Sequence, residues 1–182
     1  MSRIYLFRGM IATGKTMIAN LLGDRLGIPV YRKEDIYHAI DIPAFDHQKK
    51  NDMAYSALLK TVQAAIDEKR DFVVDIGLAH WPKFEWFITQ LNLQRARLYR
   101  FVCVCSDEEI WRERVEASLL SHQEDVHFHS AEEAIYHYRN KDSAPREGEY
   151  VLDSVEPAEQ LLKKVLLLSY PAYSGHGHGE PA

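Results

Sequence analysis

The hydrophobic and polar positions along this chain predict strands and helices in alternation. Short apolar runs are typical of buried strands, and apolar residues three and four apart are typical of amphipathic helices. The predicted strands cover 4–7, 28–31, 72–76, 98–105 and 150–152. The predicted helices run from 17 to near 27, through 36–40, 55–66 and 84–91, from 106, from 130 to about 140, and over 158–168. Such alternation, with near-continuous apolar strands, favours an α/β fold in which helices cover both faces of a parallel sheet.

Local signals place several ends of these elements. Residues 106–109 (Ser-Asp-Glu-Glu) and 130–133 (Ser-Ala-Glu-Glu) are capping boxes, which favour a helix that begins with the serine as its N-cap. Pro82 falls in the first turn of its helix, where proline is tolerated. Residues 41–52 are polar and contain one proline, and we expect them to form a loop.

The composition is that of one globular domain. The chain has 182 residues, of which 46% are hydrophobic and 27% charged, and its formal net charge of −5 gives no general attraction for polyanions. We expect a domain over 1–168 and a disordered tail rich in Gly, Pro and His over 169–182. No apolar run approaches the length of a membrane span, so we expect neither a membrane partner nor a signal peptide.

The two cysteines, Cys103 and Cys105, lie two apart in a predicted strand, so both are expected to point to the same face. Neither has a partner elsewhere in the chain, and a role as small apolar filler is favoured over a redox or metal role. A cytoplasmic protein is the expectation that follows.

Residues 9–16 carry the most informative motif. They read Gly9-Met10-Ile11-Ala12-Thr13-Gly14-Lys15-Thr16, which fits the Walker A or P-loop pattern G-x-x-x-x-G-K-[ST] between a predicted strand and a predicted helix. In that context, backbone N–H groups and a helix N-terminus surround a phosphate chain. We expect Lys15 to reach the β- and γ-phosphates and the Thr16 hydroxyl to bind Mg²⁺. The motif therefore predicts a nucleoside triphosphate site.

Acidic residues after the second and third predicted strands narrow the choice among the classes of P-loop protein. The chain lacks the Asn-Lys-x-Asp motif of GTPases, and it is too short for a motor with a helical lid domain, which leaves the compact P-loop kinase plan. Asp75 ends the third strand, where a carboxylate can hold Mg²⁺ or orient an acceptor, or can simply cap a turn. Asp35 follows the second strand and can accept the proton of an attacking hydroxyl, or cap a helix. Glu34 competes for the same role, and the register favours Asp35.

Several motifs resemble those of the AAA-type small P-loop kinases, a group that includes polynucleotide 5′-hydroxyl kinases, zeta-toxin-like kinases and chloramphenicol phosphotransferase-like enzymes. The resemblance is carried by Arg8-Gly9-x4-Gly14-Lys15-Thr16, Lys33-Glu34-Asp35-Ile36-Tyr37, Val73-Val74-Asp75, Ser106-x-x-Glu109-x4-Arg114 and Tyr150-Val151-Leu152-Asp153-Ser154. It implies a three-layer P-loop NTPase fold with five parallel strands in the order 2-3-1-4-5. It also implies a helical lid over about 112–146 and Asp35 as the general base.

Two positions depart from the family pattern. Where polynucleotide kinases have an arginine that grips the acceptor phosphate, this chain has His38, a weaker and titratable anion ligand. In the lid, Ser118 replaces a family-typical arginine. Arg112 and Arg114 face different sides of one helix, and the register favours Arg114 as the residue that reaches the transferred phosphate.

Other candidates in the lid are less defined. A surface ion pair with Glu109 or Glu113 is the alternative for Arg114, and Arg139 and Arg146 could contribute from the other side of the lid. A polar cluster is more typical of a solvated loop or part of an acceptor pocket than of a zinc site. It comprises His122, Glu124, Asp125, His127 and His129.

Three functions fit the sequence. The first is an ATP- and Mg²⁺-dependent kinase that phosphorylates a hydroxyl of a small molecule, with Lys15, Asp35 and Arg114 as catalytic residues and His38 and Asp75 on the substrate side. The second is a polynucleotide 5′-hydroxyl kinase, which the acidic charge and His38 disfavour. The third is an ATP-binding module without catalysis, which the atypical lid suggests.

Overall fold

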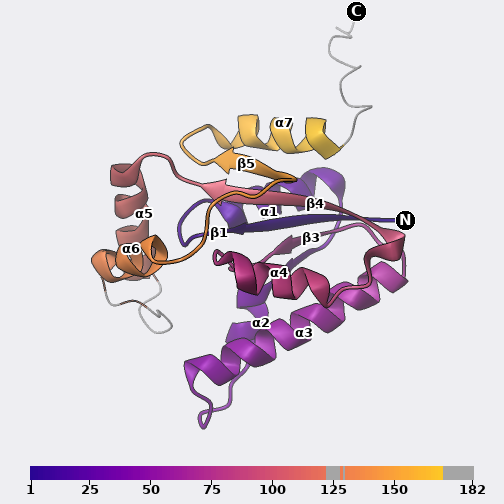
Figure 1. Cartoon of the computed structure of the whole chain (residues 1–182), viewed down its shortest axis with the longest axis horizontal. Helices are drawn as coiled ribbons and strands as arrows, with labels where there is room; N and C mark the ends of the chain where they lie inside the picture. Colours follow the sequence, from indigo (N-terminus) through magenta and orange to yellow (C-terminus); the bar gives the residue numbers. More distant parts are fainter. Residues whose placement is uncertain (122–127, 129, 170–182) are drawn as a thin grey trace, which may run out of the picture.

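The computed structural model describes residues 1–121, 128 and 130–169. Five parallel strands form one sheet in the order β2-β3-β1-β4-β5, which confirms the predicted α/β fold and strand order (Figure 1). The strands are β1 (Ser2–Gly9), β2 (Val30–Arg32), β3 (Phe72–Asp75), β4 (Ala96–Val104) and β5 (Glu149–Asp153). The helices are α1 (Lys15–Leu26), α2 (Lys33–Ala39), α3 (His47–Asp67), α4 (Trp81–Thr89), α5 (Glu108–Ser121), α6 (Ala131–Arg139) and α7 (Ala158–Ser169), with a short 3-10 turn at Leu93–Arg95.

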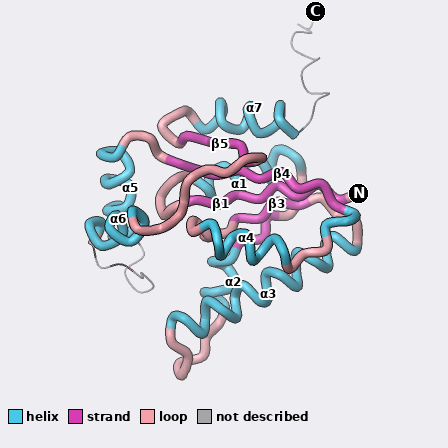
Figure 2. Tube along the Cα trace, in the orientation of Figure 1, coloured by secondary structure: helices cyan, strands magenta, loops and turns pink. Residues whose placement is uncertain are grey.

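Helices cover both faces of the sheet, and the strand alternation explains why. Along β1, Tyr5 and Phe7 pack with α1 and α7, whereas Ile4 and Leu6 pack with α3 and α4. Figure 2 shows these two helix layers on opposite sides of the strands. Because successive side chains of a strand point to opposite faces, a strand covered on both faces needs an apolar residue at nearly every position.

The two helices α5 and α6, called the lid helices below, extend from the carboxyl edge of the sheet, where the P-loop also lies (Figure 1). They form a third apolar cluster, to which Trp111, Val115 and Ile135 contribute, and the P-loop residues 10–12 pack against it. The indole N–H of Trp111 donates to the carbonyl of Ile11 at 2.8 Å. The lid helices and the P-loop therefore share one packing unit.

One element differs clearly from the sequence prediction. Residues 41–52 are not all loop, because α3 begins at His47. Asp46 is its N-cap and accepts a hydrogen bond from the backbone N–H of Lys49 at 2.8 Å. The first turns of α3 are mostly exposed, so their polar residues lacked the apolar periodicity that indicates a helix.

The capping signals gave mixed results. Ser130 caps α6 as predicted, with its hydroxyl accepting from the backbone N–H of Glu133 at 3.1 Å. At α5 the N-cap is Asp107 instead of Ser106, because the Asp107 carboxylate accepts from the backbone N–H groups of Glu109 and Ile110, both at 3.0 Å. The backbone N–H of Ser106 donates to Asp153 instead.

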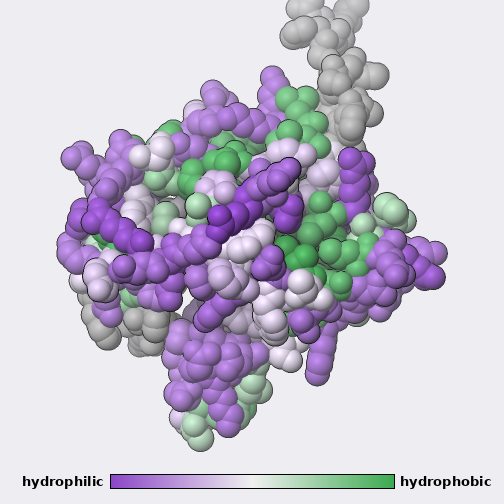
Figure 3. All heavy atoms as spheres, in the orientation of Figure 1, coloured by the Kyte–Doolittle hydropathy of each residue, from purple (hydrophilic) through white to green (hydrophobic). Residues whose placement is uncertain are grey.

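Within the described residues, no helix is both long and apolar enough to cross a membrane. Hydrophilic side chains cover most of the face in Figure 3, and hydrophobic surface appears near α7. Val151 of β5 and Leu167 and Leu168 of α7 are among the exposed apolar residues. The predicted tail, apart from Ser169, and the His-rich cluster at 122–129 lie outside the described residues.

Candidate functional site

The P-loop backbone takes a form that depends on its two glycines. Gly9 has a φ of 147°, and a Cβ at this position would lie 2.3 Å from the carbonyl oxygen of Cys103 in β4. Gly14, the N-cap of α1, has a φ of 77°. The Thr13 hydroxyl closes the loop by donating to the carbonyl of Met10 at 2.9 Å. The loop therefore connects β1 directly to the N-terminus of α1, the geometry that binds phosphate groups.

Lys15 and Thr16 lie where the motif predicts, in the first turn of α1. The Lys15 ammonium donates to the Met10 carbonyl at 2.5 Å, so its side chain folds back along the loop. The Thr16 hydroxyl donates to Asp75 at 2.6 Å, and this carboxylate, at the end of β3, is only 7% exposed. The structure thus brings together two residues that the sequence assigned separately to a metal.

This pair fits Mg²⁺ by its chemistry. A hydroxyl and one carboxylate are hard oxygen donors, and Mg²⁺ in phosphoryl-transfer sites takes one or two such ligands together with substrate phosphates and water. The described residues contain no group of three or more His, Cys, Asp or Glu that could hold a metal alone. The Thr16–Asp75 pair therefore suits a metal ion that arrives with a nucleotide.

Among the lid arginines, Arg114 is connected to the P-loop through Ser154. Its guanidinium donates to the hydroxyl and the carbonyl of Ser154 at 2.8 and 3.1 Å. Ser154 in turn packs on the P-loop, because a Cβ on Gly14 would lie 3.4 Å from the Ser154 Cβ. Arg112 points elsewhere and pairs with Glu132 at 2.6 Å, as its helix register predicts.

The other two arginines pair within the lid. Arg139 at the end of α6 pairs with Glu108 at the start of α5, and Arg146 pairs with Asp142. Each of these two cations is therefore paired with a carboxylate of the lid and not with Asp75.

The two carboxylates that follow β2, Glu34 and Asp35, pair with different cations. Asp35 pairs with Arg32 at 2.8 Å and its side chain is 57% exposed. Glu34 pairs with Lys33 at 2.8 Å, and its Oε1 would lie 3.6 Å from a Cβ built on Gly77, just past β3. The ring of His38 meets Tyr37 edge-on, with centroids 5.5 Å apart.

Arg8, directly before the P-loop, has a role that sequence reasoning missed. Its guanidinium is fully buried and pairs with the buried carboxylate of Glu149 at 2.6 Å. It also donates to the carbonyls of Ala79 and Ala144, both at 2.9 Å. Arg8 thereby fastens the segment that returns from the lid to β5 onto the strand that carries the P-loop. The signal was present as a charged residue directly after the apolar run 4–7 and directly before the P-loop.

Both cysteines are free thiols, as predicted. Burial raises the pKa of Cys103 to about 12, with the Lys15 charge opposing and the Asp75 charge adding to the shift. Cys103 is thus apolar filler behind the P-loop. Cys105 lies beyond the end of β4, half-buried, and its thiol donates to the Asp107 carbonyl at 3.3 Å.

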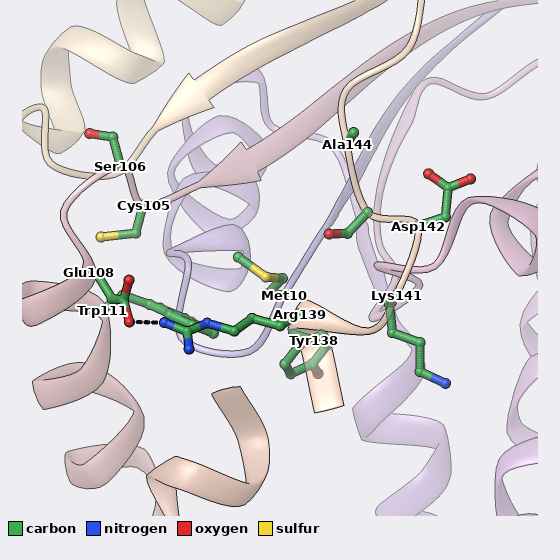
Figure 4. Close-up of a pocket in the computed structure, with 11 residues that line it drawn as sticks. Met10, Cys105, Ser106, Glu108, Trp111, Tyr138, Arg139, Lys141, Asp142 and Ala144 are labelled. Carbon is green, nitrogen blue, oxygen red and sulfur yellow. Dashed lines mark hydrogen bonds and ion pairs between the residues drawn. The ribbon is translucent and has the colours of Figure 1, made fainter. Parts of the chain in front are cut away.

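A pocket of about 450 Å³ lies between the start of α5 and the segment after α6. Figure 4 shows Met10 of the P-loop facing it together with Cys105, Trp111 and Tyr138. The Arg139–Glu108 pair spans one side of this pocket (Figure 4). Sequence reasoning did not predict this pocket, because its lining comes from three segments far apart in the chain.

Two half-buried tyrosines, also missed, interact electrostatically with Glu34. Burial, with the Glu34 charge next and Tyr138 after it, raises the pKa of Tyr55 on α3 well above its usual range. Burial likewise raises the pKa of Tyr138 on α6 to about 12, where a hydrogen bond with the Ile11 backbone opposes the shift and the Glu34 charge adds to it. Glu34 therefore lies within electrostatic reach of both α3 and the lid.

The sheet order, the P-loop and the lid helices together define the three-layer P-loop NTPase fold of the small kinases. A family model described as an AAA domain matches residues 4–140, and the chain belongs to this family. A search among curated proteins finds no match.

Solved structures that include small kinases share the fold at low sequence identity. A sugar kinase from Janibacter sp. HTCC2649 is 16% identical with a TM-score of 0.66, over 97% of this chain and 100% of that one. The tunicamycin resistance protein of Deinococcus radiodurans is 18% identical with a TM-score of 0.65, over the whole of both chains. The Mycobacterium tuberculosis APS kinase CysC, solved with AMPPNP and APS, is 13% identical with a TM-score of 0.63, over 92% of this chain and 96% of that one.

Proposed function

We propose that this protein is an ATP-dependent phosphotransferase that moves the γ-phosphate of ATP to a hydroxyl group of a small molecule. The observation that carries the proposal is the 2.6 Å contact between Thr16 and Asp75 beside the P-loop. It joins the two oxygen donors for Mg²⁺ to a loop built for phosphates. The likeness to a sugar kinase and to an APS kinase supports a small acceptor.

Each site residue has a role in the proposed transfer. Lys15 neutralises charge on the β- and γ-phosphates, and Arg114 stabilises the transferred group from the side of Ser154. Thr16 and Asp75 hold Mg²⁺, which when bound supplies further neutralisation of the phosphates. His38 lies on the acceptor side.

The transfer itself is an in-line displacement. The acceptor oxygen forms a bond to the γ-phosphorus, the bond from that phosphorus to the bridging oxygen breaks, and ADP leaves. The proton of the acceptor hydroxyl goes to a carboxylate of the Glu34–Asp35 pair, where the sequence register favours Asp35. Closure of the lid helices over the P-loop excludes water, which limits loss of phosphate by hydrolysis.

The test is transfer from γ-labelled ATP with Mg²⁺ to two sets of acceptors. One is an oligonucleotide with a 5′-hydroxyl, and the other is a pool of nucleosides, sugars and hydroxylated antibiotics. We expect label on a small molecule, and a loss of at least about 100-fold in Lys15→Ala, because one preorganised charge contributes that much. Lys163→Ala, an exposed lysine on α7, is the matched control and keeps the activity.

Other outcomes overturn the proposal. Label on the oligonucleotide alone would make the protein a polynucleotide kinase. ATP binding without transfer to any acceptor would make it a non-catalytic nucleotide-binding module. Transfer that survives in Lys15→Ala would remove the P-loop from the reaction.

A further inference from the structure

Glu34 and Asp35 are neighbours in the first turn of α2, and they cannot both face the P-loop. Adjacent helical residues point about 100° apart, because a turn holds 3.6 residues. The Asp35 carboxylate lies against Arg32, at 2.8 Å. The Glu34 carboxylate instead lies beside Gly77, where a Cβ would be 3.6 Å from Oε1.

The position of Gly77 connects Glu34 to the site. Gly77 follows Asp75 by two residues at the carboxyl end of β3, and Asp75 accepts the Thr16 hydroxyl. The backbone N–H of Ile76, between them, donates to the carbonyl of Phe7 just before the P-loop. Glu34 is therefore the carboxylate of this pair that lies at the edge where the P-loop and β3 meet.

A buried lysine fixes this carboxylate. Lys33 is 6% exposed, and its ammonium contacts Glu34 Oε1 at 2.8 Å and the Asn51 side-chain oxygen at 2.9 Å. The ammonium also lies 4.8 Å from the centre of the Tyr37 ring and 5.6 Å from that of Tyr55. Such a buried charge keeps a definite position, because leaving its partner would strand it without compensation.

The network continues into α3. The Asn51 side-chain nitrogen is 2.6 Å from Nε2 of His47, whose Nδ1 is 2.9 Å from the Tyr37 hydroxyl. The chain of contacts thus runs from Glu34 through Lys33, Asn51 and His47 and returns to α2 at Tyr37. Asp35 pairs instead with Arg32, whose side chain is 34% exposed against 7% for that of Lys33, and a partly exposed cation holds a carboxylate more weakly.

The lid also meets Glu34. Its charge contributes to the raised pKa of Tyr138, which contacts the P-loop backbone at Ile11, and to the raised pKa of Tyr55. Both shifts agree with the contacts above in bringing Glu34 within electrostatic reach of α3 and the lid.

We propose that Glu34, held by the buried ammonium of Lys33, is the carboxylate that receives the proton of the acceptor hydroxyl, and that Lys33 is its positioning residue. This inference rests on the proposed phosphotransfer. As the acceptor oxygen bonds to the γ-phosphorus and the bond to ADP breaks, the acceptor O–H bond breaks and its proton passes to a Glu34 oxygen. The Glu34 side chain is 58% exposed, as open to an acceptor as that of Asp35 at 57%, and its buried partner Lys33 is what distinguishes it.

The experiment compares Glu34→Gln with Asp35→Asn, two matched changes of carboxylate to amide one residue apart. Rates are measured with ATP, Mg²⁺ and the best acceptor of the panel above, or with water as acceptor where the protein only hydrolyses ATP. We expect kcat of Glu34→Gln to fall about 10²- to 10⁴-fold, the usual contribution of a general base, with little change in KM for ATP. Asp35→Asn should keep at least about tenfold more activity than Glu34→Gln.

Lys33→Met tests the positioning role. It should lower kcat in the wild-type background and have little further effect in Glu34→Gln, because the two residues then act through one contact. Thermal stabilisation by ADP shows in each variant that the protein is folded and still binds nucleotide.

The outcomes separate the two proposals. If the wild type turns over ATP and Glu34→Gln does so equally well, or if Asp35→Asn is the more damaged variant, the assignment of Glu34 is wrong and the proposed function stands. If the wild type turns over no ATP under any condition, the proposed function fails and this inference fails with it. If Lys33→Met lowers kcat by the same factor in the wild type and in Glu34→Gln, then Lys33 acts only through the fold.

Discussion

The buried ion pair between Arg8 and Glu149 gives a direct test of how the segment that returns from the lid to β5 is held in place. Both side chains are fully buried and the pair is 2.6 Å apart. The Arg8 cation further packs against aromatic rings, with Trp81 and Phe84 centroids at 5.4 and 5.1 Å. In Glu149→Gln the side chain keeps its shape, but the Arg8 charge remains buried without a countercharge.

Leaving such a charge unpaired costs about 3–5 kcal/mol of unfolding free energy. For a domain of this size, that loss corresponds to a fall in Tm of roughly 6–20 °C. Urea unfolding followed by circular dichroism should show a lower midpoint with an unchanged slope. The double variant Arg8→Met/Glu149→Leu, which replaces the pair with apolar groups, should be much closer to the wild type in stability.

A loss of less than about 1 kcal/mol in Glu149→Gln would refute this reasoning, because that is the contribution of an exposed pair. The same conclusion would follow if the double variant were as unstable as the single one. The first result would mean that water reaches Arg8, and the second that the hydrogen bonds of Arg8 to the carbonyls of Ala79 and Ala144 matter more than the charge pairing.

Two further predictions concern the P-loop and the acid side of the stability curve. Gly9→Ala should lower the unfolding free energy by at least about 1–3 kcal/mol through backbone strain and the close carbonyl of Cys103, measured by urea unfolding. Gly27→Ala, whose Cβ would meet nothing within 4 Å, is the control and should be less destabilising. Partial burial alone would raise the pKa of Asp153, but hydrogen bonds from Ser106 and the Val155 N–H lower it below its ordinary value of 3.8. The resulting stabilisation is present above that value and is lost as pH falls through the lowered pKa, so Asp153→Asn should unfold with a weaker dependence on acid pH. If the unfolding free energy of Asp153→Asn fell with acid pH as steeply as that of the wild type, that assignment would be contradicted.

The sequence predicted those parts of the fold that local patterns determine. Apolar runs such as 72–76 mark strands because both faces of the sheet are covered, and the glycines of the P-loop mark a backbone that other residues cannot adopt. The Gly27 end of α1 is a further case, since this residue has the left-handed conformation that terminates helices.

Where contacts between distant segments decide, the sequence was less informative. The start of α3 was missed because its first turns face solvent and carry no apolar pattern. The Arg8–Glu149 pair joins residues 141 positions apart, and no local rule connects them. The choice between Glu34 and Asp35 depends on which neighbouring cation each one meets, and register alone cannot give that.

The apolar cluster that the lid helices share with residues 10–12 has a consequence for turnover. Trp111 and Ile135 pack in the cluster that covers Met10 and Ile11, so a lid that swings away must expose this apolar surface to water. Product could leave only when the lid opens at this cost in free energy, or by a narrower route past the lid. In the proposed reaction the limiting step would then be departure of ADP, and substitutions that shrink the Trp111 side chain would shorten the residence time of the product.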